Sequence, residues 1–127
     1  MTLEEVREIL KAELLTHNVN LSIEVCSACA SDMMSDVLAL TEPGALIITG
    51  LATTQTLRTM EIADAAAVVF VRGKRPDDDV IALADKKEIP LMSTEFCMHD
   101  ACGLLFLRGL CGVTEQVKKL LNKNGRR

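Results

Sequence analysis

Two cysteines stand three positions apart in the sequence, a spacing that is typical of metal-binding and redox-active thiol pairs. The thiolates of Cys26 and Cys29 can hold a single Zn²⁺ or iron ion, or act together as a redox dithiol. A complete metal site needs further ligands, which Cys97, His99 or Cys102 would have to supply. The pattern therefore gives a hypothesis of a Zn²⁺ or iron–sulfur site that is built on Cys26, Cys29 and Cys97.

The alternative interpretation is that these cysteines are reduced thiols without a metal. The chain has five cysteines, an odd number that excludes complete internal pairing. The first eight residues are acidic and amphipathic, unlike a secretory signal, so we expect a cytoplasmic protein in a reducing compartment. Free cysteine also packs as a small apolar residue. We therefore expect no cofactor, with the metal or cluster site as the alternative.

A short basic loop gives a second candidate site. Arg72, Lys74 and Arg75 surround Gly73, and backbone N–H groups beside several cations can hold a phosphate or carboxylate. Three aspartates follow directly at Asp77–Asp79, and they oppose a bound anion. The competing interpretation is a solvated loop whose bases pair weakly with these acids.

Hydroxyl and glycine residues follow the other predicted strands. Backbone N–H groups in such loops can bind an anion, although Gly50 also suits a tight turn, and Ser31 or Asp32 and Thr53 or Thr54 also suit helix caps. The residues that we expect to contact a ligand are Ser27, Ser31, Asp32, Thr49, Gly50, Thr53, Thr54, Gln55, Arg72, Gly73, Ser93 and Thr94.

Catalytic signatures are missing from the sequence. No Gly-x-x-x-x-Gly-Lys-Ser/Thr phosphate-binding loop occurs, which excludes kinase chemistry of that type. Neither His17 nor His99 has a flanking nucleophile and acid. We therefore expect no catalytic residues and no enzymatic activity.

Composition and charge exclude several kinds of partner. The 127 residues are 49% apolar and 25% charged, with three phenylalanines and no Trp or Tyr, which disfavours base stacking. Residues 1–112 carry nine basic against seventeen acidic side chains, whereas residues 113–127 carry five against one. An acidic body disfavours nucleic-acid binding, and no apolar run reaches the roughly 18 residues of a membrane span. We expect one domain over residues 1–112 and a basic C-terminal helix and tail over residues 113–127.

Apolar periodicity predicts the elements that must position these residues. Thr2 and Glu5 form a capping-box pattern, and strand-like and helical stretches then alternate. Expected helices cover about residues 3–15, 32–40, 54–64, 77–87, 95–107 and 115–122, and expected strands cover 21–25, 45–48, 66–71 and 90–92. The alternation predicts a mostly parallel sheet of four to five strands inside a three-layer α/β/α sandwich. Ligands bind beyond the carboxyl ends of such strands.

Three stretches give the chain a resemblance to a known family. Ala45–Gly50, Val68–Gly73 followed by Pro76, and Ile89–Thr94 resemble the DRTGG domain, over about residues 2–110. That family is related to the N-terminal domain of HPr kinase/phosphorylase and occurs within some phosphotransacetylases and CBS-containing pyrophosphatases. With Ala30–Leu38, the chain is most similar to small stand-alone members that are often encoded near iron-only hydrogenase genes.

The resemblance implies an α/β/α sandwich, frequent dimerisation and a regulatory or ligand-sensing role. The family's Asp-Arg pair is replaced by Ala52–Gln55, and Arg72-Gly73-Lys74 stands in place of Thr-Gly-Gly, so ligand contacts of the missing residues do not carry over. We expect a non-catalytic, homodimeric regulatory module that binds a small anionic ligand or a partner protein. The alternative is a metal or iron–sulfur accessory protein with a redox-enzyme partner.

Overall fold

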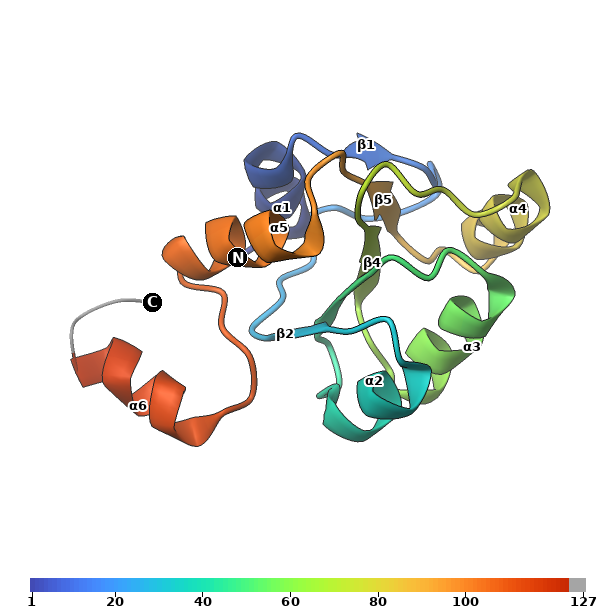
Figure 1. Ribbon diagram of the computed structural model, residues 1–127. Helices are drawn as coiled ribbons and strands as arrows, with labels where there is room; N and C mark the ends of the chain where they lie inside the picture. Colours follow the sequence, from blue (N-terminus) through green and yellow to red (C-terminus); the bar gives the residue numbers. More distant parts are fainter. Residues whose placement is uncertain (124–127) are drawn as a thin grey trace.

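Five short strands form one sheet in the computed structural model, which describes residues 1–123 (Figure 1). The sheet order is β1-β5-β4-β3-β2. Strands β2 to β5 are parallel to one another, and β1 pairs with β5 in the antiparallel sense. The strands are β1 (Glu13–Leu14), β2 (Ala28–Ala30), β3 (Leu46–Thr49), β4 (Ala67–Phe70) and β5 (Leu91–Ser93).

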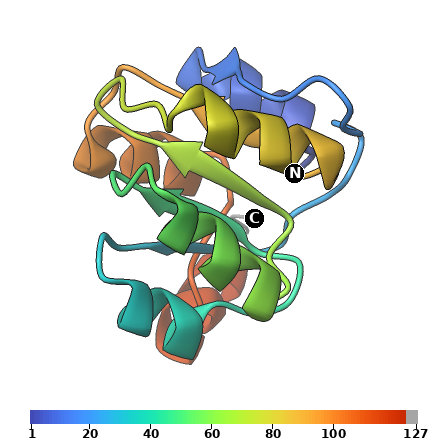
Figure 2. The ribbon, with the colours of Figure 1, turned by 90° about the vertical axis from the view of Figure 1, so that its right-hand side faces the viewer.

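Helices cover both faces of this sheet and make the predicted three-layer sandwich. Their bounds are α1 (Leu3–Leu10), α2 (Met34–Leu40), α3 (Thr54–Ile62), α4 (Asp78–Lys86), α5 (Met98–Leu107) and α6 (Glu115–Lys123). Helices α2, α3 and α4 each join two neighbouring parallel strands and lie side by side on one face (Figure 2). Helices α1 and α5 pack on the other face. The prediction of an α/β fold with a mostly parallel sheet is therefore confirmed.

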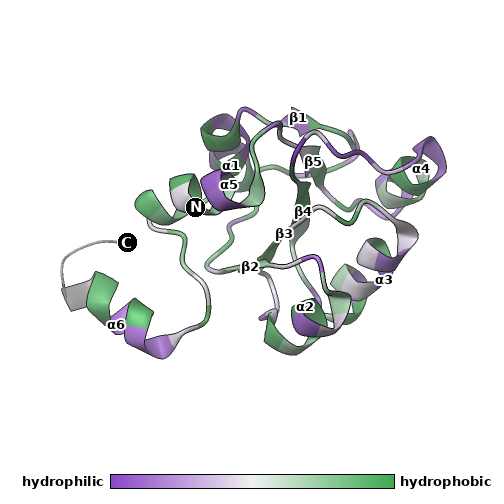
Figure 3. Cartoon of the chain, in the orientation of Figure 1, coloured by the Kyte–Doolittle hydropathy of each residue, from purple (hydrophilic) through white to green (hydrophobic). Residues whose placement is uncertain are grey.

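The core lies on both sides of the two central strands. All four residues of β3 and all four of β4 are buried, and Figure 3 shows these strands as hydrophobic. Successive side chains point to opposite faces, so Ile48 packs with α1 and α5 whereas Ile47 and Phe70 pack with α2 to α4. Continuous apolar runs are typical of strands that are covered on both faces, and they explain why these two strands were predictable.

The first helix is shorter than the sequence predicted. It begins at the predicted capping box, where the Thr2 hydroxyl accepts the Glu5 N–H. It ends at Leu10 rather than Leu15, because Lys11 adopts a left-handed conformation with φ of 48°. The chain can then turn into β1, which pairs with β5 along the edge of the sheet.

The predicted strand over residues 21–25 does not form. This segment instead pairs with the start of the chain, where the Leu3 N–H donates to the Ile23 carbonyl and the Val25 N–H to the Met1 carbonyl. The strand lies three residues later, at Ala28–Ala30. Strand β2 therefore occupies half of residues 26–31, a stretch that lay outside the predicted strands and helices.

The predicted helix caps are only partly correct. Helix α2 begins after Met33, and no side chain caps it. The Ser31 hydroxyl accepts the Met33 N–H in a local turn, and Asp32 makes its contacts outside the helix. Thr53 occupies the capping position of α3, without a side-chain hydrogen bond.

The C-terminal helix forms where it was predicted. Helix α6 begins at Glu115, and Lys118 lies 3.8 Å from a Glu42 carboxylate oxygen. Residues 124–127 of the predicted basic tail lie outside the described residues. Among the helices of residues 1–123, none combines the length and the apolar character that a membrane crossing requires.

Candidate functional site

The C-terminal ends of β2, β3, β4 and β5 lie side by side because these strands are parallel neighbours. We call this edge, with the loops that follow the strands, the carboxyl edge. The residues that follow β2 (Ser31 and Asp32), β3 (Gly50), β4 (Arg72 and Gly73) and β5 (Thr94 and Glu95) all belong to it. It is the part of a parallel sheet where ligands most often bind.

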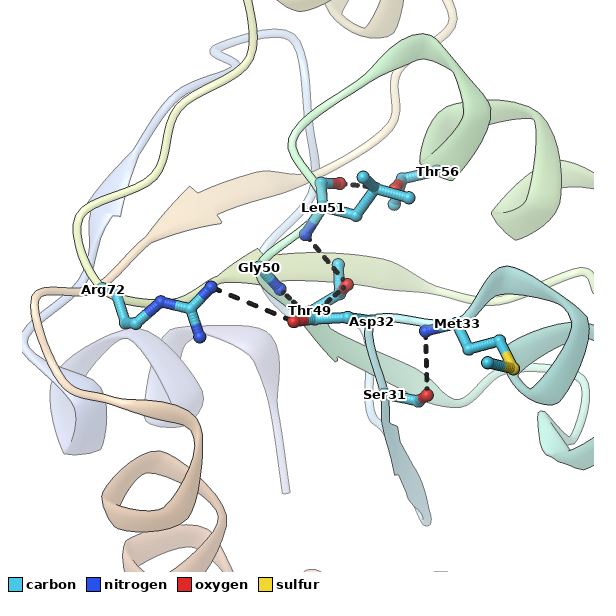
Figure 4. Close-up of polar contacts among 8 residues, drawn as sticks. All are labelled: Ser31, Asp32, Met33, Thr49, Gly50, Leu51, Thr56 and Arg72. Atoms are coloured by element: carbon cyan, nitrogen blue, oxygen red, sulfur yellow. Dashed lines mark hydrogen bonds and ion pairs between the residues drawn. The ribbon is translucent and has the colours of Figure 1, made fainter.

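Asp32 connects the first two loops of the carboxyl edge. Its Oδ1 accepts the Gly50 N–H at 2.6 Å and the Thr49 hydroxyl at 3.2 Å (Figure 4). The Thr49 hydroxyl in turn accepts the Leu51 N–H at 3.1 Å. Each group in this chain of hydrogen bonds polarises the next. Asp32 is therefore a cross-strand acceptor that organises the loop after β3, and not the helix cap that the sequence predicted.

Arg72 approaches the same carboxylate from the neighbouring strand. One of its guanidinium nitrogens lies 3.9 Å from Asp32 Oδ2, and both side chains are about half exposed, at 48% and 54%. A guanidinium offers five N–H donors, and Figure 4 shows one terminal nitrogen of Arg72 turned away from Asp32. The ion pair is long and solvated, so it holds Arg72 loosely and leaves donors free for another anion.

Gly50 makes room for this arginine. A Cβ at position 50 would overlap with Arg72 Nη2 and would stand 3.3 Å from Asp32 Oδ1. The guanidinium therefore lies directly over the glycine backbone. The arrangement explains why a residue without a side chain stands here, beyond the tight turn that the sequence indicated.

The path of the chain changes side between β4 and β5. After β4 the chain enters α4 on one face of the sheet, and after β5 it enters α5 on the opposite face. The two loops therefore diverge, and the crevice at such a switch point is the preferred binding place in open α/β sheets. Here two backbone bonds join the beginnings of the two loops, from the Arg72 N–H to the Phe96 carbonyl and from the Gly73 N–H to the Thr94 carbonyl.

A cavity of about 190 Å³ lies beside this switch point. It is lined by Lys11, Glu13, Gly73, Arg75, Ser93 and Glu95. Glu95 lies over Gly73, which has a left-handed φ of 68° and no space for a Cβ, while Arg75 pairs with Glu13. The cavity brings two cationic side chains to the same edge as Arg72.

Sequence reasoning missed Lys11, Glu13 and Glu95 as residues of this edge. Lys11 and Glu13 were assigned to a long first helix, whereas they lie where the chain turns into β1. The apolar spacing gave no signal of this turn, because Leu14 follows Leu10 at helical spacing. Glu95 was placed at the start of the expected helix 95–107, whereas α5 begins at Met98, and nothing local indicated that Glu95 lies over Gly73.

Several other predicted ligand residues lie elsewhere or are already engaged. Ser27 precedes β2, is buried, and so lies at the opposite end of the strand from Ser31. The Ser93 hydroxyl donates to the Lys74 carbonyl at 2.8 Å, and the Thr94 hydroxyl donates to the Leu10 carbonyl at 2.7 Å. These two side chains therefore hold loops together. Thr53 ends the loop that follows β3 and so belongs to the carboxyl edge, and Thr54 and Gln55 begin α3 directly after it.

The three cysteines of the predicted metal site lie apart. Cys29 is buried in β2, Cys26 precedes that strand, and Cys97 stands at the start of α5 beyond β5. Strands β2 and β5 are separated by two others, which at roughly 4.8 Å a step amounts to about 14 Å. In the part of the chain that the structure describes, no three His, Cys, Asp or Glu side chains are grouped so that they could hold a metal ion.

Comparisons with known proteins agree with this fold. The sequence profile of the DRTGG domain matches residues 5–101, and no curated protein matches the chain. One similar solved structure is the CBS and DRTGG domains of the regulatory region of Clostridium perfringens pyrophosphatase, complexed with the activator diadenosine tetraphosphate. It superposes with a TM-score of 0.68 at 18% identity, over 82% of this chain. The chain spans 45% of that structure's length.

Proposed function

The chain belongs to the DRTGG domain family, and we propose that it is a non-catalytic regulatory module that binds a small anionic ligand at the carboxyl edge. The observation that carries the proposal is the placement of Arg72 over Gly50, beside a carboxylate that is already engaged. The planar guanidinium of an arginine recognises phosphate and carboxylate groups by donating two parallel hydrogen bonds.

The neighbours of Arg72 support a ligand-dependent exchange of partners. Asp32 Oδ1 is held by the Gly50 N–H and the Thr49 hydroxyl, so Asp32 stays in place when Arg72 turns to an external anion. Only the 3.9 Å ion pair is given up, and half-exposed pairs of this kind contribute at most about 1 kcal/mol. A bound anion thus replaces a weak contact with a stronger one, at a small energetic cost.

The class of ligand that we propose first is a phosphate-bearing small molecule. The similar Clostridium perfringens region was solved with diadenosine tetraphosphate, whose phosphates are anionic. Lys11 and Arg75 line the adjoining cavity and add positive charge along the path of an extended phosphate chain. Glu95 and Glu13 lie in the same cavity. The anionic groups of the ligand must therefore bind near Arg72 and away from these two carboxylates.

Isothermal titration with diadenosine tetraphosphate, ATP and inorganic phosphate tests this proposal. We expect at least one of these probes to bind, and Arg72→Ala to weaken its binding tenfold or more. Arg72→Lys keeps the charge but loses the planar guanidinium, so it should give an intermediate affinity. Arg58→Ala is the matched control, because Arg58 is an exposed arginine on α3.

Two results would refute the proposed ligand site. One is that none of the three probes binds at millimolar concentration. The other is that Arg72→Ala and Arg58→Ala weaken binding equally, which would mean that the probes respond to net charge alone.

The functional unit that we propose is a homodimer. A small domain has little surface with which to cover its own apolar segments, and several large apolar side chains remain exposed in the single chain. Closed twofold dimers are the commonest way to cover such surface.

A further inference from the structure

Helix α5 is apolar on nearly all of its sides. Ala101 and Leu105 are buried against the sheet. On the outer side, Leu104, Phe106 and Leu107 are exposed by 37%, 39% and 77%, and Figure 3 shows the C-terminal half of α5 as hydrophobic. A helix that is apolar all round is normally covered all round. In the single chain, α5 is covered on one side, by α1 and the sheet.

The outer side of α5 also contains a hollow. A cavity of about 340 Å³ is lined by Phe96, His99, Asp100, Gly103, Leu104 and Leu107. Beyond its two chain neighbours and the backbone of its own helix, no atom of residues 1–123 lies within 4 Å of the position that a Cβ of Gly103 would occupy, so the glycine opens the middle of the helix to close approach. Leu107 stands one helical turn further on and projects most of its side chain into solvent.

We propose that a second copy of this chain docks on this face, with the two α5 helices packed antiparallel about a twofold axis near Gly103. The inference names the interface of the homodimer in the proposed function and rests on it. In a twofold interface the same patch serves both copies, and α5 has both parts that this requires. It has a projecting leucine, Leu107, and beside that leucine a hollow that takes Leu107 of the other copy.

Charge also favours the antiparallel arrangement. Asp100 lies in the first turn of α5 and Arg108 caps its last turn, and both are exposed. Antiparallel packing brings Asp100 of one helix towards the Arg108 end of the other, twice in each dimer; Arg108 follows the last turn and stands at the flank of the helix, where it lines a pocket with Met1 and Glu5. It also aligns the helix dipoles in opposite directions. A parallel pair would instead place like charges together.

The size of the contact sets the expected strength. A helix of ten residues is about 15 Å long, which gives an interface near the small end of the specific class. We therefore expect a dissociation constant in the micromolar range and a dimer that dissociates on dilution.

The interface is connected to the carboxyl edge through one residue. The Phe96 carbonyl accepts the Arg72 N–H at 2.9 Å, and the Phe96 side chain lines the hollow on α5. A copy that packs on α5 therefore restrains the loop that holds Arg72. Any effect of dimerisation on ligand binding must be matched by an equal effect of the ligand on dimerisation.

Sedimentation equilibrium of the full chain from 1 to 200 µM, without ligand, tests the interface. We expect a monomer–dimer equilibrium that Leu107→Lys shifts at least tenfold towards monomer. Gly103→Ala, which meets no atom of its own chain, should weaken the dimer by obstructing close approach while leaving the fold intact. Ile62→Lys is the matched control, because Ile62 is 72% exposed on α3, and it should leave the equilibrium unchanged. Circular dichroism verifies that each variant is folded.

Two outcomes would overturn the proposed interface. One is a wild-type chain that stays monomeric up to 200 µM, which would leave the apolar face to a different partner. The other is a dimer that Leu107→Lys leaves intact, which would place the interface elsewhere. Neither outcome removes the proposed ligand site, because Arg72 lies outside α5 and probe binding is measured separately.

Discussion

The guanidinium of Arg72 lies over the backbone of Gly50, in space that a side chain at position 50 would fill. The two residues follow neighbouring parallel strands, and Asp32 contacts both of them. A glycine, an arginine and an aspartate from three strands thus form one polar cluster at the carboxyl edge.

Gly50→Ala should separate ligand binding from stability. No left-handed φ is required at Gly50, and the atom that a Cβ would meet is the end of a flexible side chain. We therefore expect a change in unfolding free energy below about 1 kcal/mol, together with a loss of affinity close to that of Arg72→Ala. Urea denaturation and titration of the same preparation measure both. Gly112→Ala, whose Cβ would make only an ordinary 3.6 Å contact, is the control. Unchanged affinity in Gly50→Ala would contradict the assigned role of Arg72.

Thr16→Val should destabilise the edge where β1 joins β5. The buried Thr16 hydroxyl donates to the Ile89 carbonyl at 2.9 Å and accepts the Leu91 N–H at 3.0 Å. Valine has the same shape without the hydroxyl, so it leaves two buried backbone groups unpaired, at a cost of about 2 to 3 kcal/mol. Thr16→Ser keeps the hydroxyl and should lose less. Chemical denaturation of both variants checks the order, and equal losses would show that the methyl group matters as much as the hydrogen bonds.

Acid should weaken the attachment of the segment after β1 to α4. Hydrogen bonds from the backbone N–H groups of Asn18 and His17 lower the pKa of Asp85 below its ordinary value of 3.8. A lowered pKa in the folded state means that the carboxylate stabilises the fold above pH 3.8, and that this stabilisation is lost as the pH falls through the folded-state pKa.

Asp85→Asn tests this dependence. The variant should be less stable than the wild type at neutral pH, and the difference should disappear as the pH falls below 3.8, in urea titrations at a series of pH values. Glu8→Gln removes an exposed carboxylate from α1 and controls for the change in net charge. A difference that stays constant with pH would show that the carboxylate charge plays no part.

Cysteine alkylation should follow the exposure that the structure assigns. Cys26 and Cys97 are exposed and Cys29 is buried, while burial raises the pKa of the Cys102 thiol above its ordinary value of 9.0. Because the thiolate is the reactive species, Cys102 should react slowly with iodoacetamide at pH 8 and accelerate as the pH is raised. Mass spectrometry of peptides gives the order, and all five cysteines should react alike in urea. Fast labelling of Cys29 in the folded protein would contradict its burial in β2.

The sequence predicted the centre of the fold better than its borders. The buried runs of β3 and β4 are unambiguous because four consecutive apolar residues suit a strand that is covered on both faces. The strand β2 was missed because Ala28–Ala30 is short and has no β-branched residue. The alternation at residues 21–25 looked more like a strand, yet its backbone bonds go to the first residues of the chain.

The residues of the candidate site were also predicted better than the contacts between them. Asp32, Thr49, Gly50 and Arg72 were all expected at strand ends, and the structure brings them together. Their contacts were not predictable, since Asp32 and Arg72 are forty positions apart and no local pattern indicates a contact over that separation. The Cys-x-x-Cys spacing suggested that both thiols face one metal ion, but the alternation of side chains along β2 turns Cys29 into the core.

The order of the elements along the chain has a consequence for how the protein folds. Strands β2 to β5 and helices α2 to α4 come from one continuous stretch in which each element packs on its neighbour in sequence. The opposite face is closed by α1 and α5, which come from distant parts of the chain. Contacts over such separations form late because the loop must first be closed. We therefore expect a partly folded state in which α1 and α5 have not yet packed on the sheet. In this state the apolar residues of α5 are exposed, and we expect neighbouring partly folded chains to associate through them first.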